Sequence, residues 1–138
     1  MNKVSFDIPG MDDILKGGVM RDSSILLTGG PGTGKSIFGF QFIYNGAKRN
    51  IPGLYITSEQ SVDGLKACFS ELGWDMDDYE NKGLITIIEQ SVTSGKMLSL
   101  EAPLSLIKKK KIQRVVLDSL TLFEFVYSTM NFFFSIQL

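Results

Sequence analysis

The residues with the clearest chemical potential form one glycine-rich run. It reads GGPGTGKS and comprises Gly29, Gly30, Pro31, Gly32, Thr33, Gly34, Lys35 and Ser36. The run matches the pattern G-x-x-x-x-G-K-[ST], in which glycines let consecutive backbone N–H groups point at phosphate oxygens. In such a loop Lys35 supplies a mobile positive charge for the β- and γ-phosphates, and the Ser36 hydroxyl can ligate Mg²⁺. The run therefore predicts a site for the phosphates of a nucleoside triphosphate.

Two alternatives compete with this interpretation of the glycines. A glycine-rich turn followed by Lys-Ser by chance would give the same letters without the chemistry. A dinucleotide-binding loop, with Glu59 as its ribose-binding acid, would need glycines spaced as G-x-G-x-x-G, and these glycines do not follow that spacing. The Gly-Lys-Ser ending and a position between an apolar run and a helical pattern favour the triphosphate.

Two carboxylates are candidates for the remaining chemistry. Asp118 ends the apolar run RVVL, as in a Walker B strand that delivers a carboxylate to Mg²⁺; the alternative is a turn or a helix cap. Glu59 follows LYITS and could accept a proton from an attacking water, or could equally be a favourable charge at a helix N-terminus. The chain has no His and one Cys, which excludes histidine-based acid–base catalysis and an internal disulfide framework.

Alternating apolar runs and helical patterns must position these residues. Helical spacing predicts a short helix after Pro9 and longer helices over residues 35–48, 62–72 and 103–110. Apolar runs between turn signals predict strands at 24–28, 54–57, 84–88 and 114–117. The alternation predicts an α/β fold with a mostly parallel sheet and flanking helices. Ligands of such sheets bind beyond the carboxyl ends of the strands, where the glycine-rich run, Glu59 and Asp118 all fall.

Composition narrows the class of protein and its partners. The 138 residues correspond to about one domain, with ordinary globular values of 43% hydrophobic and 21% charged residues. A net charge of −1 gives no general attraction to nucleic acid. The lysine run at 108–111 is interpreted as a solvated helix end, with a nucleic-acid contact as the alternative. Residues 1–10 contain no signal-peptide pattern, and polar residues within 120–138 argue against a membrane span, so we expect a cytoplasmic protein.

Four stretches resemble the RecA-superfamily ATPases of the KaiC-like and RadA-like kind. Residues 9–18 resemble that family's PGLDELLGGG, 41–47 its QFLYNGA, 54–60 its LYVTLEE and 111–120 its KRVVIDSL strand. The similarity extends from about residue 6 to about residue 122. It implies a RecA-like P-loop NTPase core, ATP and Mg²⁺ as ligands, Glu59 as the residue that activates water, and a homo-oligomer, in the family often a hexameric ring.

Two departures from the family pattern shape our expectations. Gln60 stands where many KaiC-like members have a second Glu, which predicts slow hydrolysis if that residue matters. Family domains also continue past the Walker B strand, whereas here the similarity stops near residue 122. We therefore expect residues 1–122 to form the N-terminal part of such an ATPase domain, incomplete at the C-terminus, and residues 123–138 to form a divergent apolar tail from truncation or a frame shift. Residues 132–138 either insert as the missing central strand or leave an apolar patch that promotes self-association.

These observations support two main hypotheses about function. The first is an ATP-binding protein with Mg²⁺-dependent ATPase activity, in which Glu59 and Lys35 are catalytic and Ser36 and Asp118 serve the metal. The alternative is a non-catalytic nucleotide-binding or regulatory interaction module. A small-molecule P-loop kinase is disfavoured because no Arg-rich lid segment is evident. A role in recombination, clock-type regulation or signalling does not follow from the residues, because a shared fold does not fix function.

Overall fold

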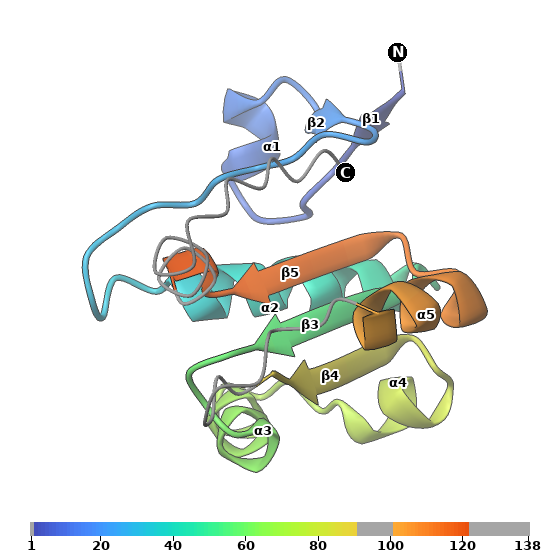
Figure 1. The fold of residues 1–138 in the computed structure, drawn as a ribbon. Coiled ribbons are helices and arrows are strands. Elements are labelled where there is room, and N and C mark those ends of the chain that lie inside the picture. The colour runs from blue at the N-terminus through green and yellow to red at the C-terminus, as the bar shows by residue number, and fades with distance from the viewer. Residues whose placement is uncertain (1, 91–100, 122–138) are drawn as a thin grey trace, which may run out of the picture.

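The computed structural model describes residues 2–90 and 101–121, and these residues contain a three-stranded parallel sheet with helices on both faces (Figure 1). Its strand order is β4 (Ile85–Glu89), β3 (Gly53–Thr57), β5 (Arg114–Asp118). The described helices are α1 (Met11–Ile14), α2 (Lys35–Lys48), α3 (Val62–Glu71), α4 (Asp77–Asn81) and α5 (Glu101–Lys110). A small antiparallel pair, β1 (Lys3–Val4) and β2 (Val19–Met20), lies near the N-terminus.

Both strand pairs of the larger sheet are parallel and share one register. Gly53 lies opposite Ile85 on one side and Arg114 on the other, while Thr57 lies opposite Glu89 and Asp118. The carboxyl ends of all three strands therefore meet at one edge of the sheet, as the sequence predicted. This edge carries Glu89 and Asp118 and leads into Glu59.

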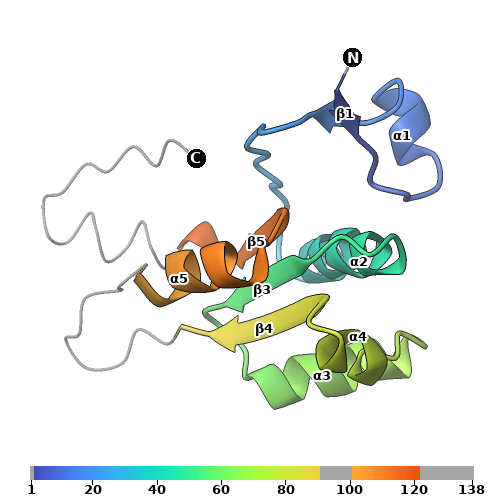
Figure 2. The same cartoon turned by 90° about the vertical axis from the view of Figure 1, so that its right-hand side faces the viewer.

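The central strand β3 is buried along its whole length because helices cover both faces of the sheet. Tyr55 belongs to the larger core cluster, which joins α2, α3 and β4 on one face. Leu54 and Ile56 point to the opposite face, where Leu106 and Ile107 of α5 pack on them. Figure 2 shows α5 and α2 on opposite sides of the sheet. A continuous apolar run is therefore the expected sequence of this strand, since neither face meets water.

Helix α2 lies close to β5 because a glycine faces the strand. A Cβ on Gly46 would come within 2.8 Å of the Arg114 Cδ, which is closer than real Cβ atoms approach other groups. The absence of a side chain at this position lets the two elements approach each other. The helix that begins at the glycine-rich run is thereby held against the strand that ends at Asp118.

Most of the predicted elements are present in the described part of the chain. The predicted helix over 35–48 coincides with α2, and α3 begins after Ser61, whose hydroxyl accepts a 3.1 Å hydrogen bond from the Gly64 N–H. The strands predicted at 54–57, 84–88 and 114–117 correspond to β3, β4 and β5 within one residue. Pro103 lies in the first turn of α5, as expected of a residue that lacks a backbone N–H.

The prediction of a buried strand at 24–28 is wrong within the described residues. Residues 23–30 are not part of any strand, and the Ile25, Leu26 and Leu27 side chains are 51%, 73% and 42% exposed. An apolar run becomes a strand only when a neighbouring strand completes its hydrogen bonds. None of the strands in residues 2–90 and 101–121 pairs with this segment. The expectations for 123–138, including an inserted strand at 132–138, lie outside the described residues.

None of the described helices combines the length and apolar character that a bilayer crossing requires.

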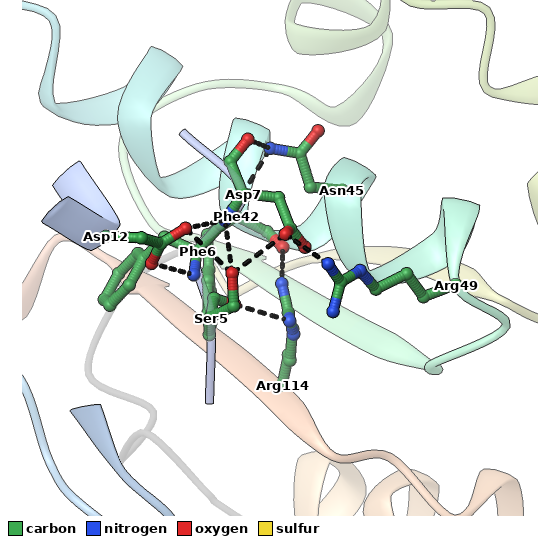
Figure 3. Close-up of polar contacts among 8 residues, drawn as sticks. All are labelled: Ser5, Phe6, Asp7, Asp12, Phe42, Asn45, Arg49 and Arg114. Atoms are coloured by element: carbon green, nitrogen blue, oxygen red, sulfur yellow. Dashed lines mark hydrogen bonds and ion pairs between the residues drawn. The ribbon is translucent and has the colours of Figure 1, made fainter. Parts of the chain in front are cut away.

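The N-terminal segment is fixed by the Asp12 carboxylate, as Figure 3 shows. Asp12 accepts 2.8 Å hydrogen bonds from the backbone N–H groups of Phe6 and Asp7 and from the Ser5 hydroxyl. From α2, the Asn45 side-chain amide donates to the carbonyl oxygens of Phe6 (3.1 Å) and Asp7 (2.8 Å). The segment is therefore organised around one carboxylate and attached to the middle of α2.

A buried cation attaches the same segment to β5. Arg114 is 3% exposed, and its guanidinium donates to the carbonyl oxygens of Phe42 (2.7 Å) and Ser5 (2.8 Å) while lying 4.4 Å from the Phe42 ring centroid. Burial lowers the pKa of Arg114, yet an arginine stays protonated in proteins. Arg49 adds an ion pair to Asp7 at 2.5 Å. The N-terminal segment, α2 and the start of β5 are thus held together by polar contacts.

We predict that Asp12→Asn lowers the free energy of unfolding by about 1–2 kcal/mol at neutral pH, because hydrogen bonds to a charged acceptor are lost. Burial disfavours the charged carboxylate, but the hydrogen bonds from Phe6, Ser5 and Asp7 outweigh it and hold the pKa of Asp12 below its usual 3.8. Because the pKa is lower in the folded state, ionised Asp12 stabilises the fold at any pH above the pKa of the unfolded state. That stabilisation is lost as the pH falls through the pKa of the folded state.

Urea unfolding at pH 7 and pH 3 checks this prediction, with Asp13→Asn as the matched control on the exposed neighbouring carboxylate. The difference between wild type and Asp12→Asn should shrink at the lower pH. An equal difference at both pH values would contradict the role of the Asp12 charge.

Candidate functional site

The glycine-rich loop, residues 29–36, connects the segment at 23–28 to the N-terminus of α2. Gly34 is the residue that precedes the helix, and its φ of 93° lies in the left-handed region that favours glycine. A Cβ at this position would meet no atom within 4 Å, so the requirement for glycine comes from the backbone conformation and not from crowding. The loop is exposed along residues 29–34, which leaves it accessible to a ligand.

Lys35 folds back over the glycine-rich loop. Its ammonium donates hydrogen bonds to the carbonyl oxygens of Gly29 (2.7 Å) and Gly30 (2.8 Å). The Thr33 hydroxyl also donates to Gly30 O, at 2.7 Å. A cavity of about 250 Å³ lies beside the loop, and its lining includes Leu27, Thr28, Gly29, Gly34, Lys35 and Phe38. The lysine charge therefore lies at the edge of a cavity that both ends of the loop help to line.

A second cavity of the same volume contains none of the predicted site residues. It is lined by Lys66 and Ser70 of α3 together with Trp74 and the residues that follow it. Lys35, Ser36 and Asp118 instead lie at the glycine-rich loop.

The Asp118 carboxylate is the meeting point of the site. Its Oδ2 accepts a hydrogen bond from the Ser36 hydroxyl at 2.6 Å and another from the Tyr55 hydroxyl at 2.5 Å. Ser36 and Asp118 are 82 residues apart in the sequence, so this contact joins the loop to the end of β5. Tyr55 is fully buried; burial and the hydrogen bond to Asp118 raise the pKa of its hydroxyl, so the phenol remains a proton donor.

Two serines beyond the strand ends, Ser58 and Ser119, hold Glu59 near Asp118. The Ser119 hydroxyl donates to Glu59 Oε1 at 2.6 Å. The Ser58 N–H donates to Asp118 O at 2.8 Å, and the Ser119 N–H donates to the Ser58 hydroxyl at 3.0 Å. The ends of β3 and β5 are thus linked beyond their regular ladder. The exposed Glu59 carboxylate is held by Ser119, the residue that follows Asp118.

The structure brings the predicted site residues to one edge of the sheet. Ser36 and Asp118 are in direct contact, Lys35 lies across the loop, and Glu59 lies beside Ser119. Sequence reasoning assigned no role to Tyr55, Ser58 or Ser119. The position of Ser119, at a strand end directly after Asp118, is the signal that marks it, whereas the Tyr55 contact depends on which face of the sheet its ring occupies.

Ser36 and Asp118 are suited to a magnesium ion that is shared with a ligand. Mg²⁺ prefers oxygen ligands and is commonly held by one or two protein groups together with waters and substrate phosphates. A hydroxyl and a carboxylate oxygen 2.6 Å apart provide such a pair. Within the described residues there is no cluster of three or more His, Cys, Asp or Glu that could hold a metal, so an all-protein cage is not available there.

We predict that Asp118→Ala destabilises the ligand-free protein by about 1–3 kcal/mol, because the buried Tyr55 hydroxyl loses its acceptor. In a Tyr55→Phe background the same change should cost less, since that hydroxyl is already gone. Urea unfolding of the wild type, both single variants and the double variant measures this difference.

Ser36→Ala serves as the comparison, because it removes the other hydrogen bond to Asp118. Ser36 is half-buried, so water can replace part of that hydrogen bond. Strictly additive losses in the Asp118 and Tyr55 variants would contradict the coupling.

Comparison with known proteins gives a consistent set of relatives. Residues 4–133 match the family described as "ATPase: KaiC". UPF0273 proteins from Aeropyrum pernix and Pyrococcus furiosus are 42% and 41% identical to this chain over 95 residues, which is 69% of this chain. A solved KaiC-like protein from Pyrococcus horikoshii OT3 has a TM-score of 0.76 and 36% identity over 85% of this chain and 53% of its own. The match covers 38% of the length of each of the two UPF0273 relatives.

Proposed function

Because this chain belongs to the KaiC family of ATPases, we propose that it binds ATP together with Mg²⁺ at the glycine-rich loop and hydrolyses the terminal phosphate. The observation that carries the proposal is the 2.6 Å contact between the Ser36 hydroxyl and the Asp118 carboxylate. This contact supports the proposal because it joins the Ser36 hydroxyl, at the end of the loop, to the carboxylate at the end of β5. The exposed loop and the cavity beside it give the triphosphate access.

Each part of the loop has a role in holding the phosphates. The backbone N–H groups of the loop and the N-terminus of α2 attract the negative charge of the β- and γ-phosphates. Lys35 exchanges its hydrogen bonds to the Gly29 and Gly30 carbonyls for phosphate oxygens, which are stronger acceptors because they are charged. Ser36 and Asp118 would hold Mg²⁺, which when bound neutralises charge on the phosphate oxygens.

Glu59 is the residue that we assign to the attacking water. Its Oε1 accepts a hydrogen bond from the Ser119 hydroxyl, and this contact restrains the direction of the side chain two residues beyond the end of β3. A carboxylate held in this way can orient a water and accept its proton as the water attacks the γ-phosphorus, while the bond from that phosphorus to the β–γ bridging oxygen breaks and ADP leaves. Gln60 offers an amide and not a second carboxylate, so Glu59 carries this task without help from its neighbour.

The surface favours a protein partner over nucleic acid. Ile25, Leu26 and Leu27 expose apolar side chains next to the glycine-rich loop, and such a patch is suited to a second copy of the chain. The lysine run lies at the end of α5, where cations are favourable, and Lys110 donates to the Thr86 hydroxyl at 3.0 Å. These contacts support the helix-end interpretation of the run.

We predict that Mg-ATP binds the wild type saturably and that Lys35→Ala weakens binding by about 10–100-fold, the equivalent of one charge-assisted hydrogen bond. Isothermal titration calorimetry measures both, with Lys109→Ala as the control for removing an exposed lysine. A wild type that is folded by circular dichroism and gives no binding heat would contradict the proposal.

We predict that Glu59→Gln lowers phosphate release by about 10²–10⁴-fold, the usual contribution of a general base, and leaves Mg-ATP affinity within about twofold. A phosphate-release assay measures the rate, and Glu71→Gln, an exposed carboxylate at the end of α3, is the matched control. ATP binding without phosphate release by the wild type would favour the alternative, a non-catalytic nucleotide-binding module.

A further inference from the structure

Tyr55 is a core residue with one polar contact that packing does not require. It is 0% exposed at the centre of β3, and its ring makes edge contacts with Phe40 and Phe69, with centroids 6.1 Å away in each case. A phenylalanine ring would fill this space equally well. A buried hydroxyl is unfavourable unless it is hydrogen-bonded, and the Tyr55 hydroxyl finds its partner in Asp118 Oδ2.

The register of the sheet directs this hydroxyl to the site. Tyr55 lies opposite Val116, two pairs before the ladder ends with Thr57 opposite Asp118, so the two pairs share one face of the sheet. The Tyr55 ring therefore extends on the α2 face of the sheet toward the strand end, where the Ser36 hydroxyl arrives from the start of α2. The tyrosine reaches Asp118 from the core side, and the serine reaches it from the loop side.

Two donors on one oxygen restrict the orientation of the Asp118 carboxylate. The terminal torsion of an aspartate is soft, so an unrestrained carboxylate samples a broad range of orientations. Hydrogen bonds from Tyr55 and Ser36 converge on Oδ2, and rotation of the carboxylate would break both of them. The two contacts also differ in kind. A serine hydroxyl keeps its lone pairs for a metal while it donates, whereas the phenol of Tyr55 is buried in the core and closed to solvent.

We infer that Tyr55 is a positioning residue for the magnesium site: its buried hydroxyl fixes the Asp118 carboxylate so that Mg²⁺ binds with ATP at a lower Mg²⁺ concentration. The inference rests on the proposed function, because it concerns the same site. It assigns Tyr55 no contact with nucleotide or metal. The tyrosine acts through Asp118.

The test measures ATP binding by calorimetry at a series of Mg²⁺ concentrations, for the wild type, Tyr55→Phe and Tyr44→Phe. Tyr44 is the matched control, since it is a core tyrosine on α2 whose ring packs against Trp74 and Tyr79. We expect Tyr55→Phe to raise the Mg²⁺ midpoint by about tenfold, the lower end of the effect for residues that orient metal ligands. Affinity for ATP without Mg²⁺ should stay within about twofold, and Tyr44→Phe should match the wild type.

A double variant separates positioning from a general structural effect. In an Asp118→Asn background, Tyr55→Phe should shift the Mg²⁺ midpoint by less than about twofold, because the group through which it acts has been changed. A tenfold shift in that background would overturn the inference. A loss of ATP affinity by Tyr55→Phe that is equal with and without Mg²⁺ would also overturn it, since this is the result of a structural role.

The remaining outcomes distinguish the inference from the function on which it rests. An unchanged Mg²⁺ midpoint in Tyr55→Phe, beside a Mg²⁺-dependent wild type, overturns the inference and leaves the proposed function intact. A folded wild type that does not bind Mg-ATP overturns both.

Discussion

The in-register parallel pairing of β3 with β5 is the constraint on which the rest of the structure depends. It ends with Thr57 opposite Asp118, so Glu59 and Ser119 leave the sheet side by side. A slip of one residue would turn every side chain of β5 to the other face of the sheet. Asp118 would then point to the α5 side, away from Ser36 and Tyr55. Burial of β3 between two layers of helices, with a strand on each side, disfavours such a slip.

The second requirement is that α2 stays against β5, because this contact brings the glycine-rich loop to Asp118. Gly46 allows the close approach, and Arg114 binds the Phe42 carbonyl in α2 and the Ser5 carbonyl in the N-terminal segment. Desolvating a guanidinium is costly, and these carbonyl oxygens and the Phe42 ring offset part of that cost. The contribution of Arg114 is therefore positional. β5 holds α2 through its first residue, Arg114, and carries the Asp118 carboxylate at its last position.

Local sequence patterns predicted the elements but not the contacts that depend on pairing. Residues 35–48 carry a signal of helical spacing and residues 114–117 a signal of apolarity, and the structure agrees. Residues 24–28 carry the same kind of signal, yet they form no strand in the described part of the chain, because strand formation depends on a neighbour that local sequence does not specify. The Tyr55 contact was missed for a related reason. It follows from the register between β3 and β5, not from any spacing along the chain.

The two halves of the candidate site differ in how much they must change to receive a nucleotide. In the proposed function the Asp118 half is already arranged, because Ser36 can keep donating to Asp118 while its lone pairs face a metal. Lys35 must instead release two carbonyl oxygens of its own loop. The ammonium is charged in both states, but phosphate oxygens are stronger acceptors than neutral carbonyls because they carry charge themselves. Binding in this scheme therefore moves the half-buried lysine and leaves the Tyr55–Asp118 contact in place, which confines the rearrangement to the loop side of the site.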